Sequence, residues 1–272
     1  MDLTFFYIQI KYLSNLVTEQ ELDEHGITVT GAVPQRIPII TYPKFDQECT
    51  SLLKKHLTRD VWSNMKKKST SRGGNIQICV KSGVERPQCP IGALASDDEA
   101  YKTFGDLFNP IIRDLHPDFD NRFSYKYDIL DSSIIDQQIS QMKTAIAKIS
   151  EFKIDVSRNF ARTPFAPLMT KEAKLQVERK VVEVLGDLYG SYTQINKLNE
   201  KDIDWLKSVG IDPDNKDDEL KAAGINDDWP VGRGIFIEDD KKFVVLVNFT
   251  DHIRIISLST GSNVNDNFPS GI

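Results

Sequence analysis

The stretch that decides the fold is residues 229–257, WPVGRGIFIEDDKKFVVLVNFTDHIRIIS. It holds two runs rich in β-branched and aromatic residues, Gly234 to Ile237 and Phe243 to Asn248, and most of a third, Ile253 to Leu258. Such runs are typical of β-strands, and the charged turn from Glu238 to Lys242 would make the first two strands neighbours. The stretch therefore predicts an antiparallel sheet accompanied by helices.

Working outward from this stretch, capping residues predict helices upstream. Thr58 is placed to cap a short helix containing Trp62, and Thr170 to cap a longer one. Residues 152–160 predict an extended segment before the second helix, whereas the acidic segment 202–228 predicts a loop. The chain as a whole predicts an α+β protein.

The composition excludes several classes of protein. With 272 residues, 40% hydrophobic and 27% charged, the chain can form one large or two smaller cores. A net charge of −6 without a basic block argues against a nucleic-acid partner. The N-terminus is unlike a signal peptide, and no apolar segment has the length of a membrane span. We expect a cytoplasmic protein that binds neither nucleic acid nor membrane.

The cysteines indicate reduced thiols. Cys49, Cys79 and Cys89 are odd in number and lack both Cys-x-x-Cys spacing and a nearby pair of histidines. We therefore expect neither a disulfide framework nor a metal site.

Several motifs resemble the phosphagen (guanidino) kinases, and arginine kinases in particular. The most specific is Trp229-Pro-x-Gly-Arg-Gly234, and Asp251-His-Ile-Arg254 follows it at the family's position. Segments 51–58, 81–85 and 97–112 are similar to that family's small helical domain. The resemblance implies a small α-helical N-terminal domain followed by an antiparallel-sheet-plus-helices domain, in a divergent and C-terminally truncated relative.

The resemblance covers a helical domain at 43–118 and a partial catalytic-type domain at 152–260. Outside it we expect an extended arm at 1–42, with a mobile tail as the alternative, a linker with an amphipathic helix at 119–151 and a tail at 261–272. In the linker, Ile135, Ile139, Met142, Ile146 and Ile149 form a heptad seam. The seam would dock on the chain's own second domain or on the helix of another protein.

Phosphagen kinases transfer a phosphoryl group between ATP and a guanidine, and the resemblance implies roles for particular residues. Arg162, Arg233 and Arg254 would contact nucleotide phosphates, with a structural ion pair as the alternative for Arg233. Ser82, Gly83 and Val84 would form the loop beside the guanidine, with a generic loop as the alternative.

Other positions of the family's active site are changed. The base glutamate is Thr250, and a further acid is Phe249. Two arginine positions of the first nucleotide motif are Ser157 and Asn159, with Arg158 one residue out of phase. On an extended strand that offset turns the side chain of Arg158 to the other face.

Two functions therefore remain open. In the first, the protein is a catalytically inactive relative that serves as a structural or interaction subunit, in a cytoskeletal or ciliary assembly by analogy. It would contact other chains through residues 1–42, the isoleucine-rich seam and an exposed sheet edge. No cofactor is then expected, and MgATP or MgADP would bind only if some nucleotide binding survives. In the second, it is a weak ATP:guanidino phosphotransferase, or one completed by a missing segment.

Overall fold

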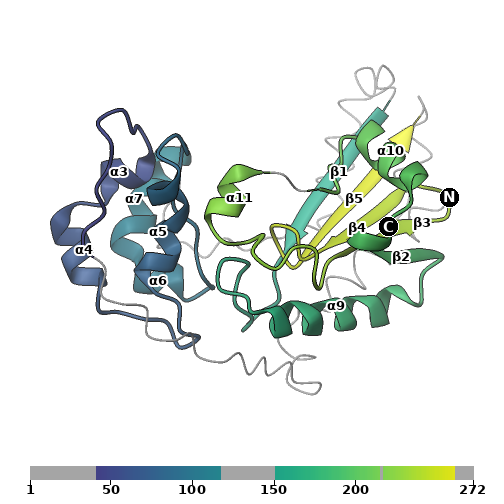
Figure 1. The fold of residues 1–272 in the computed structure, drawn as a ribbon, viewed down its shortest axis with the longest axis horizontal. Coiled ribbons are helices and arrows are strands. Elements are labelled where there is room, and N and C mark those ends of the chain that lie inside the picture. Colours follow the sequence, from purple (N-terminus) through teal and green to yellow (C-terminus); the bar gives the residue numbers. More distant parts are fainter. Residues whose placement is uncertain (1–40, 118–150, 215–216, 261–272) are drawn as a thin grey trace, which may run out of the picture.

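The computed structural model describes residues 41–117, 151–214 and 217–260. Figure 1 shows a group of helices on one side of the molecule and a sheet with its covering helices on the other. The predicted seam, the predicted tail and all of the predicted arm except residues 41 and 42 lie outside the described residues. The two parts together form the α+β architecture that the sequence predicts.

The helical part is built from five helices around one apolar core. They are α3 (Leu52–His56), α4 (Arg59–Met65), α5 (Ile76–Glu85), α6 (Ala100–Thr103) and α7 (Gly105–Leu115). The Thr58 hydroxyl accepts a hydrogen bond from the Val61 amide and caps α4, as predicted. Core side chains such as Leu53, Ile76 and Phe104 are fully buried.

The predicted substrate loop at Ser82, Gly83 and Val84 is instead the C-terminal half of helix α5. The loop prediction is wrong because Asn75 caps α5 and the helix buries Ile76, Cys79 and Val80 at helical spacing. Gly83 lies against Gly92, and its amide donates to the Gly92 carbonyl at 3.1 Å. This position is thus a packing contact between a helix and the loop that follows it.

We expect Gly83→Ala to lower the free energy of unfolding by about 1–3 kcal/mol through overpacking. A Cβ at this position would lie 2.5 Å from the Gly92 carbonyl oxygen, which is backbone and cannot swing away. Chemical denaturation measures the loss, with Gly105→Ala as the matched control. At Gly105 the nearest atom is the Asn109 side-chain nitrogen at 3.1 Å, so the control should cost little. Equal losses in both variants would contradict the close-packing argument.

The second part contains a five-stranded antiparallel sheet in the order β1-β5-β4-β3-β2. Its strands are β1 (Glu151–Arg158), β2 (Gly190–Gln194), β3 (Gly234–Glu238), β4 (Phe243–Val247) and β5 (Ile253–Thr260). The three runs in residues 229–257 are therefore neighbouring strands, as predicted. Strands β3 and β4 are buried along their whole length.

Each face of the sheet has its own cover. Helix α9 (Lys171–Leu185), capped by Thr170 as predicted, packs on the face that carries Phe236, Phe243 and Val245. The opposite face carries Val244, Leu246 and Ile256. There it meets helix α10 (Glu200–Ser208), with the short 3-10 helix η1 (Ile195–Lys197) leading into it from β2.

The segment 202–228, predicted as a loop, contains most of α10 and all of α11 (Asp218–Ala222). The prediction is wrong because caps and burial outweigh the acidic composition. Asn199 caps α10, and the Asp217 carboxylate accepts hydrogen bonds from two amides at the start of α11. Leu206 and Ile211 are buried against the sheet.

Helix α11 joins the two parts of the molecule. It lies between them in Figure 1 and packs on α5. Ala223 and Ile225 form a small core with Ala166, and Arg86 of the helical part pairs with Asp218. None of the helices in the described part of the chain has the length and apolar character needed to cross a membrane.

Candidate functional site

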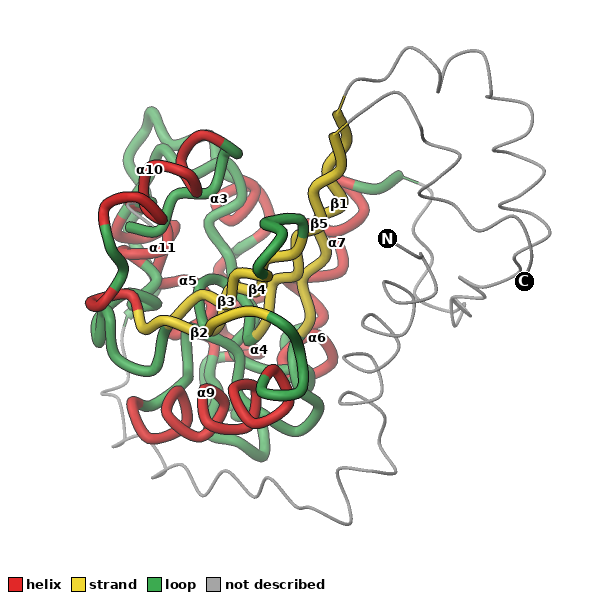
Figure 2. The backbone as a smooth tube through the Cα atoms, turned by 90° about the vertical axis from the view of Figure 1, so that its right-hand side faces the viewer, coloured by secondary structure: helices red, strands yellow, loops and turns green. Residues whose placement is uncertain are grey.

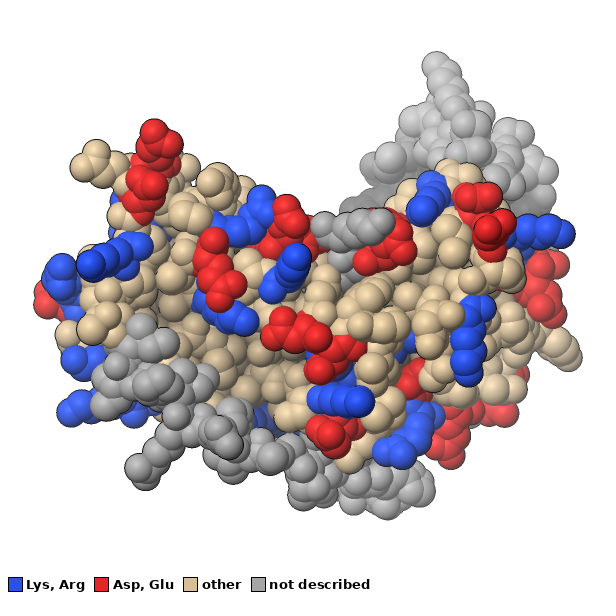
Figure 3. Space-filling view, viewed as in Figure 1, with Lys and Arg blue, Asp and Glu red and all other residues tan. Residues whose placement is uncertain are grey.

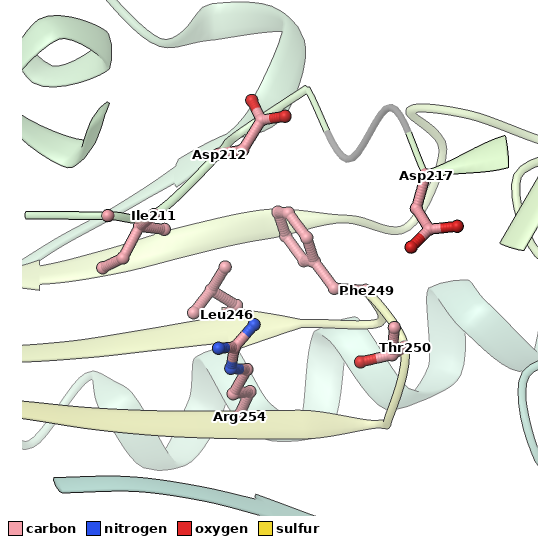
Figure 4. Close-up of a pocket in the computed structure, with 8 residues that line it drawn as sticks. Ile211, Asp212, Asp217, Leu246, Phe249, Thr250 and Arg254 are labelled. Carbon is pink, nitrogen blue, oxygen red and sulfur yellow. The ribbon is translucent and has the colours of Figure 1, made fainter. Parts of the chain in front are cut away.

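A pocket of about 250 Å³ lies where the β4–β5 turn meets the chain between α10 and α11. Figure 4 shows Arg254 and Leu246 projecting from neighbouring strands, with Phe249 and Thr250 on the turn. The residues that line the pocket are Gly210, Ile211, Asp212, Asp217, Leu246, Phe249, Thr250 and Arg254. Two of the positions singled out in the sequence, Thr250 and Arg254, are thus brought together.

Thr250 lies at the position where the resemblance places the base. Its hydroxyl lies 3.4 Å from an oxygen of Asp251, and the other Asp251 oxygen accepts a hydrogen bond from the Asn159 side-chain amide at 2.7 Å. Asn159 in turn accepts from the His252 backbone amide at 3.0 Å. Asp251 and Asn159 therefore connect the end of β1 to the β4–β5 turn. The Thr250 hydroxyl itself cannot take up a proton near neutral pH.

Phe249, which the resemblance places at another acidic position, is part of the core. Its side chain is 4% exposed and packs edge-on against Trp229 with 5.4 Å between ring centroids. This side of the pocket is therefore apolar and offers packing rather than acid–base chemistry.

Arg254 is the cation among the residues that line the pocket, and it already holds a carboxylate. Its Nε and one terminal nitrogen donate to the two oxygens of Asp155 at 2.8 and 2.6 Å. These hydrogen bonds lower the pKa of Asp155 and raise that of Arg254. An incoming phosphate would have to displace Asp155 from a bidentate pair.

Arg233 is buried away from the pocket. Its Nε donates to the Asn248 carbonyl at 2.8 Å, and its terminal nitrogens donate to the carbonyls of Val231 and Ile225. The guanidinium also lies 5.0 Å from the centre of the Trp229 ring. Burial lowers the pKa of Arg233 to about 10. This arrangement supports a structural role, and phosphate binding by Arg233 stays a prediction.

The register of β1 separates its side chains as the sequence predicts. Ser157 pairs with Arg254 and so shares its face, whereas Arg158 pairs with Ile253 on the face that α9 covers. Arg158 therefore does not substitute for a lost neighbour. Arg162 lies on the turn after β1 with an exposed side chain and φ of 58°, and it is not among the residues that line the pocket.

His252, beside the pocket, is a structural residue. Its Nδ1 accepts a hydrogen bond from the Phe160 amide at 2.8 Å, so the proton resides on Nε2, which donates to the Pro164 carbonyl at 2.9 Å. The ring is fully buried and stacks on Phe160. Burial lowers the pKa of His252 to about 4 and keeps the imidazole neutral.

The described residues contain no group of three or more His, Cys, Asp or Glu side chains arranged to hold a metal ion. Cys49, Cys79 and Cys89 are free, buried thiols of the helical part, and none of them lines the pocket. Over the described residues on the face that Figure 3 shows, basic and acidic side chains are interspersed. The polar and charged side chains among the residues that line the pocket are Asp212, Asp217, Thr250 and Arg254.

Helices on one side, an antiparallel sheet on the other and a pocket at Arg254 define a guanidino-kinase type of protein. The chain belongs to the ATP:guanido phosphotransferase family. Residues 47–113 match the model described as its N-terminal domain, and residues 172–270 match the C-terminal catalytic domain.

The relatives that this chain matches include arginine kinases. A probable arginine kinase of Caenorhabditis elegans is 33% identical over 248 residues, covering 88% of this chain and 68% of the relative. An arginine kinase of Anthopleura japonica is 36% identical over 232 residues, covering 83% of this chain and 32% of the relative. The chain spans between about a third and just under two thirds of the length of the first relatives it matches.

A solved structure has the same architecture. The duplicated taurocyamine kinase from Schistosoma mansoni, with bound transition-state-analogue components, superposes with a TM-score of 0.70 at 29% identity. The match covers 82% of this chain and 31% of that one.

Part of the pocket was not predicted from the sequence. Ile211, Asp212 and Asp217 belong to the segment that was predicted to be an acidic loop. An available signal was the cap pattern, since Asp217 precedes a short helical run and accepts from its first amides. Asp155 was also missed as the partner of Arg254, because that pairing depends on strand register.

Proposed function

We infer that this protein does not transfer phosphoryl groups at a kinase rate and acts instead by binding other proteins. The observation that carries this proposal is the pairing of Arg254 with Asp155 beside a threonine at the base position. The described pocket thus presents a neutralised arginine and a non-titrating hydroxyl where the reaction needs positive charge and a base.

The magnitudes support this proposal. Loss of a general base costs about 10²- to 10⁴-fold in rate, and loss of a preorganised charge-stabilising donor costs about 10²- to 10³-fold. Kinases turn over at about 1–100 s⁻¹, so the two losses together predict a kcat below about 10⁻² s⁻¹. The described residues near the pocket also fit a nucleotide polyphosphate poorly, because Asp155 occupies the guanidinium fork.

A weak ATP:guanidino phosphotransferase remains the second candidate. It is favoured by the retention of Arg254 in the pocket and by the relatives, whose names are arginine and taurocyamine kinases. It also accommodates the shorter span of this chain, since a further segment or chain could supply residues to the same pocket.

The test is ADP release from MgATP with arginine or taurocyamine as acceptor, comparing the wild type with Arg254→Ala. We expect both proteins to match the protein-free rate. Turnover that is equal in the two proteins would identify a contaminating kinase. Turnover in the wild type that Arg254→Ala abolishes would overturn the proposal in favour of the second candidate.

A thermal shift with MgADP separates a pseudoenzyme that still binds nucleotide from one that does not. We expect MgADP to bind too weakly to change the Tm much. A ligand stabilises a protein only when its concentration exceeds its Kd. A large, saturable shift in Tm would instead assign the pocket to nucleotide sensing.

The role that we propose is that of a cytoplasmic interaction subunit, in a cytoskeletal or ciliary assembly by analogy.

A further inference from the structure

Among the strands that the structure describes, β1 is at one edge of the sheet. Its inner edge pairs with β5 over all eight residues, and no strand among the described residues pairs with its outer edge. β4 pairs with β5 only from Ile253 to Ser257, so the far ends of β1 and β5 continue past it. Figure 2 shows this two-stranded ribbon projecting beyond the other strands. Its outer backbone groups are a template for a further strand.

The side chains at the centre of β1 have a self-complementary pattern. Lys153 and Asp155 flank Ile154, and both are partly exposed, with 32% and 30% of their side chains accessible. They lie on the face of β1 that they share with Arg254, whereas Ile154 points to the opposite face. A charge of each sign therefore stands one residue to either side of an aliphatic residue.

We propose that the outer edge of β1 pairs with β1 of a second copy of this chain, antiparallel around a two-fold axis at Ile154. In that register Ile154 faces Ile154 of the second copy, and Lys153 of each copy faces Asp155 of the other. The interface is isologous, so one attractive pair on one copy generates a second by symmetry.

The alternative registers are worse. Centring the axis on Asp155 places that carboxylate opposite its own copy, and centring it on Lys153 opposes two lysines; directly opposed like charges destabilise antiparallel pairs. An axis between Ile154 and Asp155 puts a charge opposite an aliphatic side chain. Charge complementarity thus selects the pairing at Ile154.

Asp155 can serve both partners. Arg254 engages its two oxygens, and Lys153 of the same chain lies 3.9 Å from one of them. A carboxylate has about four lone-pair positions, so room remains for an ammonium arriving across the new edge. The lysine that would otherwise protect an edge strand from pairing is here matched by an acid on the incoming strand.

Charge reversal tests the pairing in the full-length chain by analytical ultracentrifugation. We expect a reversible wild-type dimer, and we expect Lys153→Asp and Asp155→Lys each to weaken it at least about tenfold. An equal mixture of the two variants should regain association, because each aspartate then faces a lysine. Lys67→Asp, the same change at an exposed residue of the helical part, should leave the dimer unchanged.

A cysteine at the axis tests the register and does not depend on Asp155→Lys folding well. Ile154→Cys should become covalently dimeric with a short bis-maleimide, whereas Val156→Cys, displaced from the axis, should not. The native Cys49, Cys79 and Cys89 are buried, so the wild type is the unreactive control.

Three results would overturn the proposal. They are a wild type that stays monomeric at high concentration, a dimer indifferent to both charge reversals, and cross-linking of Val156→Cys in preference to Ile154→Cys. A monomer whose β1 amides resist hydrogen exchange would assign the edge to another segment of the same chain. None of these measurements depends on turnover, so self-association and loss of catalysis are judged separately.

Discussion

Replacing Arg233 by alanine is expected to lower the free energy of unfolding by about 3–5 kcal/mol, because each buried acceptor left without a donor costs about 1–3 kcal/mol. Arg233 is the largest of the fully buried side chains. Its loss would leave the carbonyls of Asn248, Val231 and Ile225 without their donor and open a cavity beside Trp229. Urea denaturation followed by tryptophan fluorescence measures the change.

Arg254→Ala is the matched control for this prediction. Arg254 also makes a bidentate contact, but its side chain is 39% exposed and that of Asp155 is 30% exposed. Pairs so accessible to water contribute about 0–1 kcal/mol, so the control should remain close to the wild type. If both variants lost the same stability, Arg233 would not be the structural anchor described above.

Acidification is expected to remove roughly 3 kcal/mol of stability through His252 alone, as linkage of its pKa shift requires. Burial lowers its pKa from 6.5 to about 4 in the folded protein. Above pH 6.5 neither state binds the proton and the contribution is complete. As the pH falls from 6.5 to 4, only the unfolded chain takes up the proton, so the contribution is progressively lost. Denaturation curves at pH 7, 5.5 and 4 measure the slope.

His252→Gln separates this effect from the carboxylates, which titrate in both proteins. The variant should be less stable at pH 7, because glutamine does not reproduce both hydrogen bonds, to Phe160 and Pro164. Its stability should then fall less steeply than that of the wild type between pH 7 and pH 4. Parallel pH profiles would show that His252 does not govern the acid response.

Local patterns in the sequence predict much of the fold. The three strands from Gly234 onward follow from β-branched runs separated by turns, and Thr58 and Thr170 cap helices because their hydroxyls reach the next free amides. The face of Arg158 follows from strand periodicity alone. Each of these inferences depends on residues within a few positions of one another.

The two segments that were wrongly predicted as loops have a different cause, which is burial in the tertiary structure. The segment 202–228 reads as a loop from its charge, yet α10 is held by Leu206 against strands far along the chain. Ser82 and Gly83 read as a loop from their motif, yet they continue helix α5, whose buried side includes both residues and packs against Gly92. In both cases tertiary burial outweighs local composition.

The sequence by itself determined the family and the antiparallel sheet, because these depend on residue identity and short-range periodicity. Only the tertiary structure decided what the arginines do. Strand register places Asp155 within reach of Arg254. The segment around Trp229 and the residue after β4 together bring three carbonyls to Arg233. A guanidinium's role is set by the partners that lie within about 3 Å of it. Asp155 is 99 residues from Arg254 and Asn248 is 15 residues from Arg233, so local sequence patterns do not reveal these partners.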